Sequence, residues 1–504
     1  MNNRAFESFP AIVERLAVDA PGPALIELAR DGSRDEYAFA EVLDASARYG
    51  SAFAAQGVSR GDVVVTMIGN RPQWVFSMLA CWRMGAVVLP CNEMLRAKDL
   101  ALRIASAAPR LVVTDERNKT ELDHSGWNGP TIVIPDESLL EYDPLPPFDA
   151  QPADPAMMIF TSGTTGEPKP VVHTHACLPG QRLQAENWFD ARPGEIAWCT
   201  AASGWSKSAR NVFLTPWLCG ATAVLHDVRF DPVERMATLA AENVNVLCMA
   251  PTEYRVIARR LELKRIPSLR QCVSAGEALN AEIFKNWHDG LGVDIHDGYG
   301  QTETGAITAV RPGDTIKPGS MGRPMPGIEI RIEDGELWVD PQTVPTFFAG
   351  YGRPNELDPP ELHPDAEGRL WWRTGDLVEQ DDDGYLWFDS RNDDIISSAG
   401  YRIGPFEVES ALISHESVAE AAAVAAPDPE RGSLVRAVIV LKDGFEGTDA
   451  LAKELQDHVK NVTAPYKYPR VVEFVDALPK TASGKIRRAE LRRLGPGNAS
   501  QFVR

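Results

Sequence analysis

Apolar residues follow two spacings along the N-terminal part of the chain, and the two spacings alternate. Segments 39–56 and 73–84 carry apolar residues at the intervals of an amphipathic helix. Short apolar runs of strand length occupy segments 62–68, 86–90, 244–250 and 269–275. Because strands that alternate with helices build parallel sheets, this pattern predicts sheets covered by helices on both faces.

The pattern changes around residues 318–340, where short hairpin-like pieces replace the longer helices. The stretch IEIRIEDGELWV, residues 328–339, is typical of these pieces. It predicts a small antiparallel sheet or barrel. After Asp394 the chain has a further set of helices and strands over roughly 110 residues, which is the size of a domain.

Composition and charge indicate a large globular enzyme. The 504 residues are 44% hydrophobic and 24% charged, with a net charge of −20 from 51 basic and 71 acidic residues. Such an acidic chain disfavours a nucleic-acid partner or an anionic membrane surface, so anionic ligands require local positive sites. No apolar run is long enough to span a bilayer, and the N-terminal segment has neither signal- nor transit-peptide character. Seven cysteines without a C-x-x-C pair predict reduced, buried thiols and a cytoplasmic protein.

The segment TSGTTGEPK, residues 161–169, is the strongest candidate for chemistry. Its glycines allow a close backbone approach to an anion, its hydroxyls add hydrogen-bond donors, and Lys169 adds a positive charge. It is not a Walker A loop, because that spacing requires glycine where Pro168 stands and Ser or Thr where Pro170 stands. A flexible surface linker is the alternative, but the flanking apolar runs 157–160 and 171–172 are typical of buried strands.

Five further motifs follow this loop. They are SAGEALN at 274, DGYGQTETG at 297, WRTGDL at 372, SRNDDIISSAGYRIGPFEVE at 390 and PKTASGKI at 479. In this order they make the chain resemble the adenylate-forming superfamily of acyl-CoA synthetases, luciferases and adenylation domains. The segments GWSKSARNVFLTPWLCGA at 204 and VTAPYKYPR at 462 are most similar to the medium-chain acyl-CoA synthetases.

The resemblance implies an α/β fold and a two-step reaction. The large N-terminal domain, residues 1–391, would hold two βα-layered subdomains and a small distorted β-barrel, and residues 392–504 would form a small mobile α+β domain. The implied activity joins a carboxylic acid to coenzyme A, with ATP and Mg²⁺, through an acyl-adenylate. Two alternatives stay open: an adenylating enzyme that loads a carrier protein, and a catalytically inactive nucleotide-binding protein.

The resemblance also assigns the nucleotide site. Its predicted ATP or AMP contacts are Thr161, Ser162, Gly163, Thr164, Thr165, Gly166, Gly276, Glu277, Ala278, Asp297, Gly298, Tyr299, Gly300, Gln301, Thr302, Asp376, Arg391 and Arg402. Tyr299 would stack on adenine, Asp376 would accept both ribose hydroxyls, and Glu303 would bind Mg²⁺. For Glu277 an ordinary strand-to-helix turn is the alternative. Arg391 would support the same ribose or the α-phosphate. Ser390 stands where the family usually has glycine, which affects the local backbone and not this role of Arg391.

The predicted catalytic residues are Lys485, Lys169 and Glu303. Lys485 would bridge the substrate carboxylate and the α-phosphate, and Lys169 would stabilise the departing pyrophosphate. Rotation about a hinge at Asp393 would then bring the coenzyme A site into place. The predicted coenzyme A contacts are Ala399, Gly400, Tyr401, Arg431, Tyr468, Pro469 and Arg470. Ala399 occupies a position that is commonly serine, and a solvated basic surface is the alternative for the arginines.

The acyl pocket is assigned by analogy to Trp205, Met249, Ala275 and Gly300. Acetate-specific relatives have tryptophan at the position of Gly300, so glycine here is expected to leave that wall open and to favour a hydrophobic medium-chain, branched or aromatic acid. A single methylene changes binding by only roughly 1–3 kcal/mol, so the pattern does not define the chain length. The histidines, including His173 and His175, show no metal-ligand spacing and are interpreted as framework residues.

Overall fold

The computed structural model describes residues 6–161, 168–277, 279, 281–391, 394–398, 401–428, 432–480 and 485–497. It separates into two compact units. The first unit comprises the described residues of 6–161, 168–329 and 340–370. The second unit comprises 330–339 and the described residues from 371 onward.

A nine-stranded sheet forms one half of the first unit. Its strands, in spatial order, are β15 (Arg323–Pro324), β14 (Gly305–Ala309), β13 (Ile295–Gln301), β12 (Gln271–Ala275), β11 (Val246–Met249), β9 (Ile196–Cys199), β10 (Thr222–His226), β1 (Leu25–Leu28) and β2 (Arg34–Tyr37). The central strands from β13 to β1 are parallel, and antiparallel pairs close both edges. The strands predicted at 244–250 and 269–275 are therefore confirmed as neighbouring parallel strands of this sheet.

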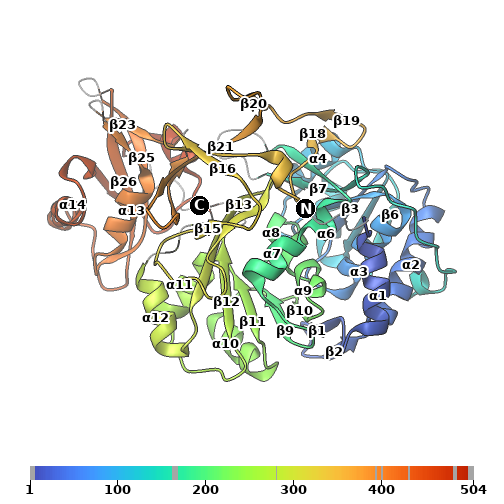
Figure 1. Ribbon diagram of the computed structural model, residues 1–504. Helices are drawn as coiled ribbons and strands as arrows, with labels where there is room; N and C mark the ends of the chain where they lie inside the picture. The colour runs from blue at the N-terminus through green and yellow to red at the C-terminus, as the bar shows by residue number, and fades with distance from the viewer. Residues whose placement is uncertain are drawn as a thin grey trace. The chain divides into compact units, whose positions relative to one another are not determined.

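Three helices cover one face of this sheet (Figure 1). They are α10 (Pro232–Ala241), α11 (Pro251–Arg260) and α12 (Ala281–Leu291). Each is amphipathic and contributes buried side chains, such as Leu239, Tyr254 and Trp287, to a common apolar core with the strands. This packing leaves the carboxyl ends of the parallel strands at one edge of the sheet.

An eight-stranded sheet forms the other half of the first unit. Its strands, in spatial order, are β19 (Glu356–Asp358), β18 (Gly350–Arg353), β8 (Pro170–Thr174), β7 (Pro155–Phe160), β4 (Val87–Pro90), β3 (Val63–Met67), β5 (Leu111–Asp115) and β6 (Thr131–Ile134). The predicted strands on either side of the TSGTTGEPK segment are confirmed as the antiparallel pair β7–β8. Thr161 N donates to Lys169 O over 2.9 Å and closes the base of that segment. Residues 162–166, predicted to bind phosphate, lie outside the described residues.

Aromatic side chains join four helices of the first unit. These are α1 (Phe9–Asp19), α2 (Phe39–Ala55), α3 (Pro72–Met84) and α9 (Leu214–Leu218). Phe9 lies 5.6 Å from Trp82 and 6.3 Å from Trp217, measured between ring centroids. The first pair is edge-to-face and the second is stacked, and aromatic pairs of both kinds stabilise a core beyond the area they bury. The helices predicted at 39–56 and 73–84 are thus confirmed, as α2 and α3.

Shorter elements complete the first unit. They are α4 (Ala97–Ala107), η1 (Glu116–Asn118), α5 (Lys119–His124), η2 (Glu137–Leu140), α6 (Cys177–Gly180), α7 (Arg182–Gln184), η3 (Ala185–Phe189), α8 (Ser206–Asn211), η4 (Pro341–Thr343) and β20 (His363–Pro364). All seven cysteines, which lie within the described residues, are free, and six of them are buried. No helix in the described part of the chain has the length and apolarity needed to cross a bilayer.

The second unit begins with a small antiparallel sheet. Its strands are β16 (Ile330–Glu333), β17 (Glu336–Val339), β21 (Leu370–Gln380) and β22 (Leu386–Arg391). The hairpin expected within 328–339 is the pair β16–β17. Its turn residues Asp334 and Gly335 both have left-handed backbones, with φ of 52° and 80°, as the common two-residue hairpin turn requires.

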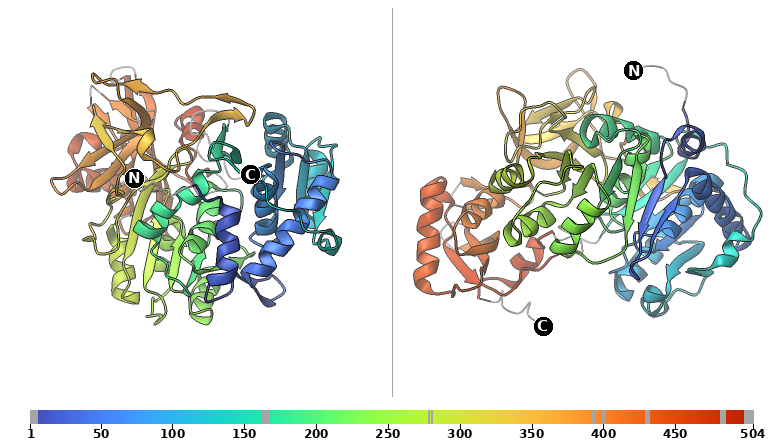
Figure 2. Two further views of the ribbon diagram at one scale, coloured as in Figure 1. Left: turned by 45° about the vertical axis from the view of Figure 1, so that its right-hand side comes forward. Right: turned by 90° about the horizontal axis from the view of Figure 1, so that it is seen from below.

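The C-terminal part of the second unit packs helices on both faces of a three-stranded sheet (Figure 2). The strands are β25 (Val418–Asp428), β26 (Gly432–Leu441) and β27 (Val471–Phe474), preceded by the hairpin β23 (Ile396–Ser398) and β24 (Tyr401–Ile403). Helices α13 (Pro405–Ile413) and α14 (Asp449–Val462) cover one face, α15 (Arg488–Leu494) covers the other, and η5 (Pro465–Lys467) follows α14. The expected α/β class, with a large sheet-based N-terminal region and a small C-terminal α+β region, is confirmed. A boundary at residue 392 stays a prediction.

Candidate functional site

The carboxyl ends of three parallel strands bring several predicted site residues together. Met249 ends β11, Ala275 ends β12, and Gly298 lies beside Ala275 on β13. Ligands of open parallel sheets bind outside such strand ends, because the loops there are free to diverge. The predicted adenine and acyl residues of the first unit therefore share one edge of the nine-stranded sheet.

Helix α8 lies against these strand ends and carries two inward-pointing cations. The Lys207 ammonium donates to Met249 O over 2.8 Å and to Ala275 O over 3.0 Å. These are the two carbonyl groups at which β11 and β12 end. The lysine therefore satisfies two orphan acceptors and ties the two strands together. The sequence prediction did not select Lys207, although a lysine three residues after a glycine in an apolar segment was visible.

Arg210, one turn further along α8, holds the next strand. Its guanidinium donates to Thr302 O over 2.9 Å, to Gln301 O over 3.4 Å and to Nε2 of His173 over 3.1 Å. Burial lowers the pKa of Arg210 to about 10, so the group stays charged at neutral pH. None of its hydrogen-bond partners within the described residues is a carboxylate.

His173 and His175 are both completely buried. Burial lowers the pKa of His173 well below its usual range and the pKa of His175 to about 4, so both rings are neutral at pH 7. Their burial agrees with the framework interpretation. In the described ranges no group of three or more His, Cys, Asp or Glu side chains is arranged to hold a metal ion.

Glu303 and Lys169 come together at Tyr351 of β18. The Tyr351 hydroxyl donates to Oε1 of Glu303 over 3.1 Å, and the Lys169 ammonium lies 5.6 Å from the centre of the Tyr351 ring. The backbone N–H of Phe348 donates to Glu303 O over 2.8 Å, which fixes the chain at that point. Three segments far apart in the sequence thus place a carboxylate, a cation and a phenol at one location. Sequence reasoning missed Tyr351, because no motif contains it.

Asp297 and Tyr299 of β13 are less accessible than the prediction implied. Burial raises the pKa of Asp297 to about 8, with Gly298 N, Lys207 and Arg255 partly offsetting the effect, so the carboxyl group is largely protonated at neutral pH. The N–H of Gly298 donates to its Oδ1 over 3.1 Å. The Tyr299 residue is only 9% exposed, so little of it is accessible in this conformation.

The SAGEALN segment turns sharply after β12. Gly276 has φ of 104°, a backbone conformation that side-chain-bearing residues rarely adopt. The Glu277 carboxylate is held by Arg255 in an ion pair and by the Thr252 hydroxyl over 3.1 Å. These contacts anchor the turn to the first turns of α11, while Ala278 lies outside the described residues.

The structure gives Gly300 a different role from the predicted open pocket wall. A Cβ atom at this position would lie 1.8 Å from Gly305 O and 2.6 Å from the Cα of Ala306. The backbone of β14 therefore occupies the space that a side chain would need, beside the bulge between Tyr299 and Gly300. In this conformation the close approach of two strands requires glycine at position 300, and the open acyl-pocket wall stays a prediction.

The other predicted acyl-pocket residues lie on two sides of the strand ends. Trp205 precedes α8 and its N–H donates to Oγ of Ser208 over 3.2 Å. Met249 is completely buried in the apolar core between β11 and the helices, whereas Trp205 and Ala275 are half-buried. Trp205 and Ala275 are therefore partly accessible, whereas Met249 belongs to the apolar core.

In the second unit, Asp376 and Arg391 face each other across β21 and β22. Arg391 Nη1 donates to Oδ1 of Asp376 over 3.0 Å, and the two residues are direct partners in the strand register. Asp376 is buried, and its N–H donates to Oγ1 of Thr374. The predicted ribose pair is thus assembled within one hairpin, with Ser390 beside it.

The predicted coenzyme A residues of the second unit form an aromatic and basic cluster. Tyr401 stacks on Tyr466 with 4.3 Å between ring centroids, and both rings are exposed. Arg470 donates to the Tyr468 hydroxyl over 2.6 Å, and the Lys460 ammonium lies 4.3 Å from the Tyr468 ring centre. Pro469 between them is buried, whereas Asp393, Ala399, Gly400, Arg431 and the Arg402 side chain lie outside the described residues.

Lys485 is exposed at the end of the undescribed segment 481–484. A backbone bridge joins Lys480 to Ile486, and Arg487 N donates to Pro479 O over 2.9 Å. The segment that carries the predicted catalytic lysine is therefore closed at its base, while the lysine itself is accessible.

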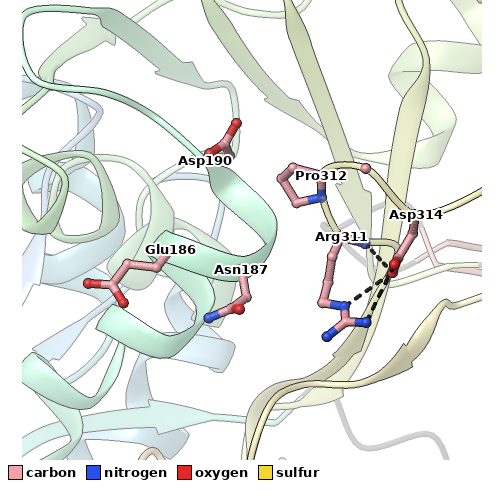
Figure 3. A pocket seen from close by; sticks show the side chains of 7 residues that line it. Glu186, Asn187, Asp190, Arg311, Pro312 and Asp314 are labelled. Carbon is pink, nitrogen blue, oxygen red and sulfur yellow. Dashed lines mark hydrogen bonds and ion pairs between the residues drawn. The ribbon is translucent and has the colours of Figure 1, made fainter.

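One polar cavity of about 330 Å³ lies away from these residues (Figure 3). Glu186, Asn187 and Asp190 line one side, and Arg311 and Asp314 line the other, joined to each other by hydrogen bonds. The lining helix segment η3 is attached near the beginning of β13, where Trp188 Nε1 donates to His296 O. The predicted site lies at the opposite end of that strand.

Comparison with known proteins shows extensive similarity. The family of AMP-binding enzymes matches residues 14–345, and the AMP-binding enzyme C-terminal domain matches residues 407–485. The uncharacterized acyl-CoA ligase YtcI of Bacillus subtilis (strain 168) is 39% identical over 510 residues, covering 95% of this chain and 94% of that protein. The mitochondrial acyl-coenzyme A synthetase ACSM3 of Mus musculus is 36% identical over 519 residues, covering 95% and 88%. The solved anthranilate CoA ligase AuaEII, in complex with anthranoyl-AMP, has a TM-score of 0.85 at 28% identity and 97% coverage of each chain.

Proposed function

Because the chain belongs to the AMP-binding enzyme family, we propose that it is an ATP-dependent acyl-CoA synthetase. The enzyme activates a carboxylic acid as an acyl-adenylate with release of pyrophosphate. It then transfers the acyl group to the thiol of coenzyme A and releases AMP. The observation that carries this proposal is the convergence of Lys169 and Glu303 on Tyr351, next to the segment closed by Thr161 and Lys169.

In the first half-reaction the substrate carboxylate attacks the α-phosphate of ATP. Two anions must meet in line, so the chain has to supply positive charge and orientation rather than a nucleophile or a base. Lys169 stabilises the pyrophosphate that leaves, and Lys485 neutralises charge between the carboxylate and the α-phosphate. Arg210, which stays charged at neutral pH, adds positive potential behind Thr302, and the Glu303 carboxylate lies within range of its charge.

Glu303 fits the role of a Mg²⁺ ligand. Carboxylate oxygens are hard donors that Mg²⁺ prefers, and the Tyr351 hydroxyl holds Oε1 so that the carboxylate has a fixed orientation. A bound Mg²⁺ ion would offset the charge of the phosphates. The Glu303 backbone is itself fixed by Phe348.

In the second half-reaction the coenzyme A thiol attacks the carbonyl of the acyl-adenylate. The cluster of Tyr401, Tyr468 and Arg470 offers aromatic faces and a guanidinium, which suit the adenine and phosphate groups of that substrate. We assign this cluster to coenzyme A and the hinge to Asp393. Asp376 and Arg391 are assigned to the ribose.

For the acid we propose a hydrophobic substrate of medium-chain, branched or aromatic type. The half-buried side chains Trp205 and Ala275 support this assignment, because they offer apolar surface at the strand ends. The related ligase AuaEII is named for an aromatic acid, which agrees with an aromatic substrate as one member of the class. We also propose a cytoplasmic location, for which free cysteine thiols are suited.

The proposal is tested by measuring AMP release from ATP with a panel of short, medium-chain, branched and aromatic acids, each with and without coenzyme A. We expect AMP release that requires both a hydrophobic acid and coenzyme A, together with acid-dependent pyrophosphate exchange in the absence of coenzyme A. Exchange without any transfer to free coenzyme A would favour loading of a carrier protein. No exchange with any acid would contradict the proposed function.

A further inference from the structure

A buried carboxylate in the second unit links two segments that both carry predicted catalytic or ribose-binding residues. The Asp394 residue is only 4% exposed, and its Oδ1 accepts a hydrogen bond from Arg492 Nη1 of α15 over 2.6 Å. Arg488, one turn earlier on the same helix, places Nη1 3.8 Å from the other carboxylate oxygen. Two guanidinium groups of one helix therefore face a single buried carboxylate.

The contact continues into the core of the small domain. Arg488 also donates to both oxygens of Glu409 on α13, over 2.7 to 3.0 Å. Glu409 in turn accepts the backbone N–H of Ala423 on β25 over 2.8 Å. Glu409, at one end of this network of charged side chains, is thus hydrogen-bonded to the backbone. Side chains held in this way have little freedom to reorient.

Asp394 and Arg492 each lie close in sequence to a residue with a proposed role in the reaction. On one side, Asp394 N donates to the carbonyl of Arg391 over 3.0 Å, and Arg391 pairs with Asp376. On the other side, α15 begins three residues after Lys485, directly behind the base closed by the bridge at Ile486. The Asp394–Arg492 contact therefore joins the helix that follows Lys485 to the residue that follows the assigned hinge.

We propose that the Asp394–Arg492 ion pair is a positioning device, which fixes Lys485, three residues before α15, relative to Asp394, the residue that follows the assigned hinge. This inference rests on the proposed acyl-CoA synthetase activity. A buried ion pair is a poor way to add stability, because desolvation offsets most of its attraction. A hydrogen-bonded ion pair does fix the relative position of the two segments that it joins. An apolar contact would fix that position less well. Adenylation requires that geometry, because Lys485 must meet the carboxylate and the α-phosphate together.

The pair does not contact the cluster assigned to coenzyme A. Tyr401, Tyr466, Tyr468 and Arg470 are held by stacking and by their own hydrogen bonds. Loss of the Asp394–Arg492 contact should therefore slow adenylation and leave the transfer step from a supplied acyl-adenylate nearly unchanged. A residue that only stabilised the domain would affect both steps alike.

The test compares Arg492→Gln with Arg493→Gln, the same change at the neighbouring exposed position of α15. Misplacing a reacting group by about 1 Å costs on the order of 100-fold in rate, so we expect acid-dependent pyrophosphate exchange to fall by about 10- to 100-fold in Arg492→Gln. Thioester formation from supplied acyl-adenylate and coenzyme A should change by less than about 2-fold on the same scale. Arg493→Gln should leave both half-reactions unchanged. Equal losses in the two half-reactions, or no loss in exchange, would overturn the proposal.

A second set of variants covers the case in which Arg492→Gln does not fold. Arg492→Lys keeps the charge but not the planar fork, and should show a smaller loss with the same bias toward adenylation. The double variant Asp394→Asn with Arg492→Gln should be no slower in pyrophosphate exchange than either single variant, because each change alone already removes the same contact. Additive losses would contradict the pair. Wild-type protein without any pyrophosphate exchange would instead reject the proposed function itself.

Discussion

Two short helices, α8 in the first unit and α15 in the second, use paired cations in opposite ways. Lys207 and Arg210 of α8 point inward and donate to backbone carbonyls at the ends of β11, β12 and β13. Arg488 and Arg492 of α15 also point inward, but they donate to the carboxylates of Glu409 and Asp394.

Because of this difference, the two helices contribute differently to the electrostatic potential. A carbonyl offers only a partial charge, so the hydrogen bonds of the α8 cations leave positive potential near the proposed phosphate site, which the nearby Glu303 carboxylate lowers in part at Arg210. A carboxylate cancels the charge of its partner, so the α15 pairs contribute geometry and little long-range field. In a chain with a net charge of −20, cations that are hydrogen-bonded to carbonyls beside an anion site matter for binding ATP, whereas α15 has to hold a lysine at a defined place.

The largest expected effect comes from the exposed cation next to α15. Lys485→Ala removes the only charge that we assign to the space between the substrate carboxylate and the α-phosphate. Acid-dependent pyrophosphate exchange should fall by roughly 10²- to 10³-fold, as for other groups that stabilise developing charge. Thioester formation from supplied acyl-adenylate should be spared. If both half-reactions fail equally, the division of work between Lys485 and the coenzyme A cluster is wrong.

The next prediction tests whether the positive charge of α8 contributes to ATP binding. Arg210→Met leaves the carbonyls of Gln301 and Thr302 without their donor, and a hydrogen bond from a charged group contributes roughly 1.5–3 kcal/mol. We expect the KM for ATP to rise by about 10- to 100-fold. Arg210→Lys keeps the charge without the fork and should be intermediate.

The matched control for Arg210 is Arg182→Met. Arg182 donates to the carbonyl of Leu218 in the same unit but has no place in the proposed site. Its KM for ATP should equal that of the wild type. An unchanged KM for ATP in Arg210→Met, with lower stability alone, would show that α8 contributes only structure.

A pH series sharpens the same comparison, because an ionised Asp297 would cancel the charge of Lys207. Burial raises the pKa of Asp297 from 3.8 to about 8, so the folded state keeps a proton that the unfolded state releases. Stability from this group is complete below about pH 4 and is lost as the pH rises toward 8, by up to about 1.4 kcal/mol per pH unit. Asp297→Asn should remove this slope. Denaturant unfolding of both proteins between pH 5 and 8.5 measures it, and parallel curves would contradict a protonated Asp297.

The smallest effect is expected at Tyr351→Phe. This change removes the hydrogen bond to Oε1 of Glu303 and keeps the ring beside Lys169. The loss of about 1–2 kcal/mol should raise the Mg²⁺ concentration needed for half-maximal pyrophosphate exchange by roughly 5- to 30-fold at saturating ATP, with little change in the maximal rate. Tyr351→Leu removes the ring as well and should weaken the exchange further. An unchanged Mg²⁺ dependence in both variants would place the metal ligand elsewhere.

Much of the architecture follows from local patterns in the sequence. Apolar runs at 157–160 and 171–172 predicted β7 and β8, and helical spacing predicted α2 and α3. These elements are readable because their side-chain periodicity depends only on which face is buried. The order of six motifs likewise indicated the family before any fold was known, and that resemblance is confirmed by matches along most of the chain.

The site could be predicted only in part from the sequence. Glu303 and Lys169 were selected from their motifs, but Tyr351, which joins them, stands in a segment without any motif. Gly300 was interpreted as an open wall, whereas the approach of β14 explains it, because no sequence pattern reveals how closely two strands pass. The contacts of Lys207 and Arg210 were equally hidden, since their partners are carbonyls that every residue possesses.

The sequence by itself determined the family, the α/β class and the residue types of the two half-reactions, because these depend on local composition and motif order. Only the tertiary structure decided which cations bond to carbonyls and which to carboxylates, which carboxyl group keeps its proton and how the base of the Lys485 segment is held. The physical reason is that each of these properties depends on burial or on which residues the fold brings into contact. Arg210 and Arg492 are both arginines on short helices, and their partners decide their roles. Arg210, bonded to a carbonyl, contributes positive potential, whereas Arg492, bonded to a carboxylate, fixes a position.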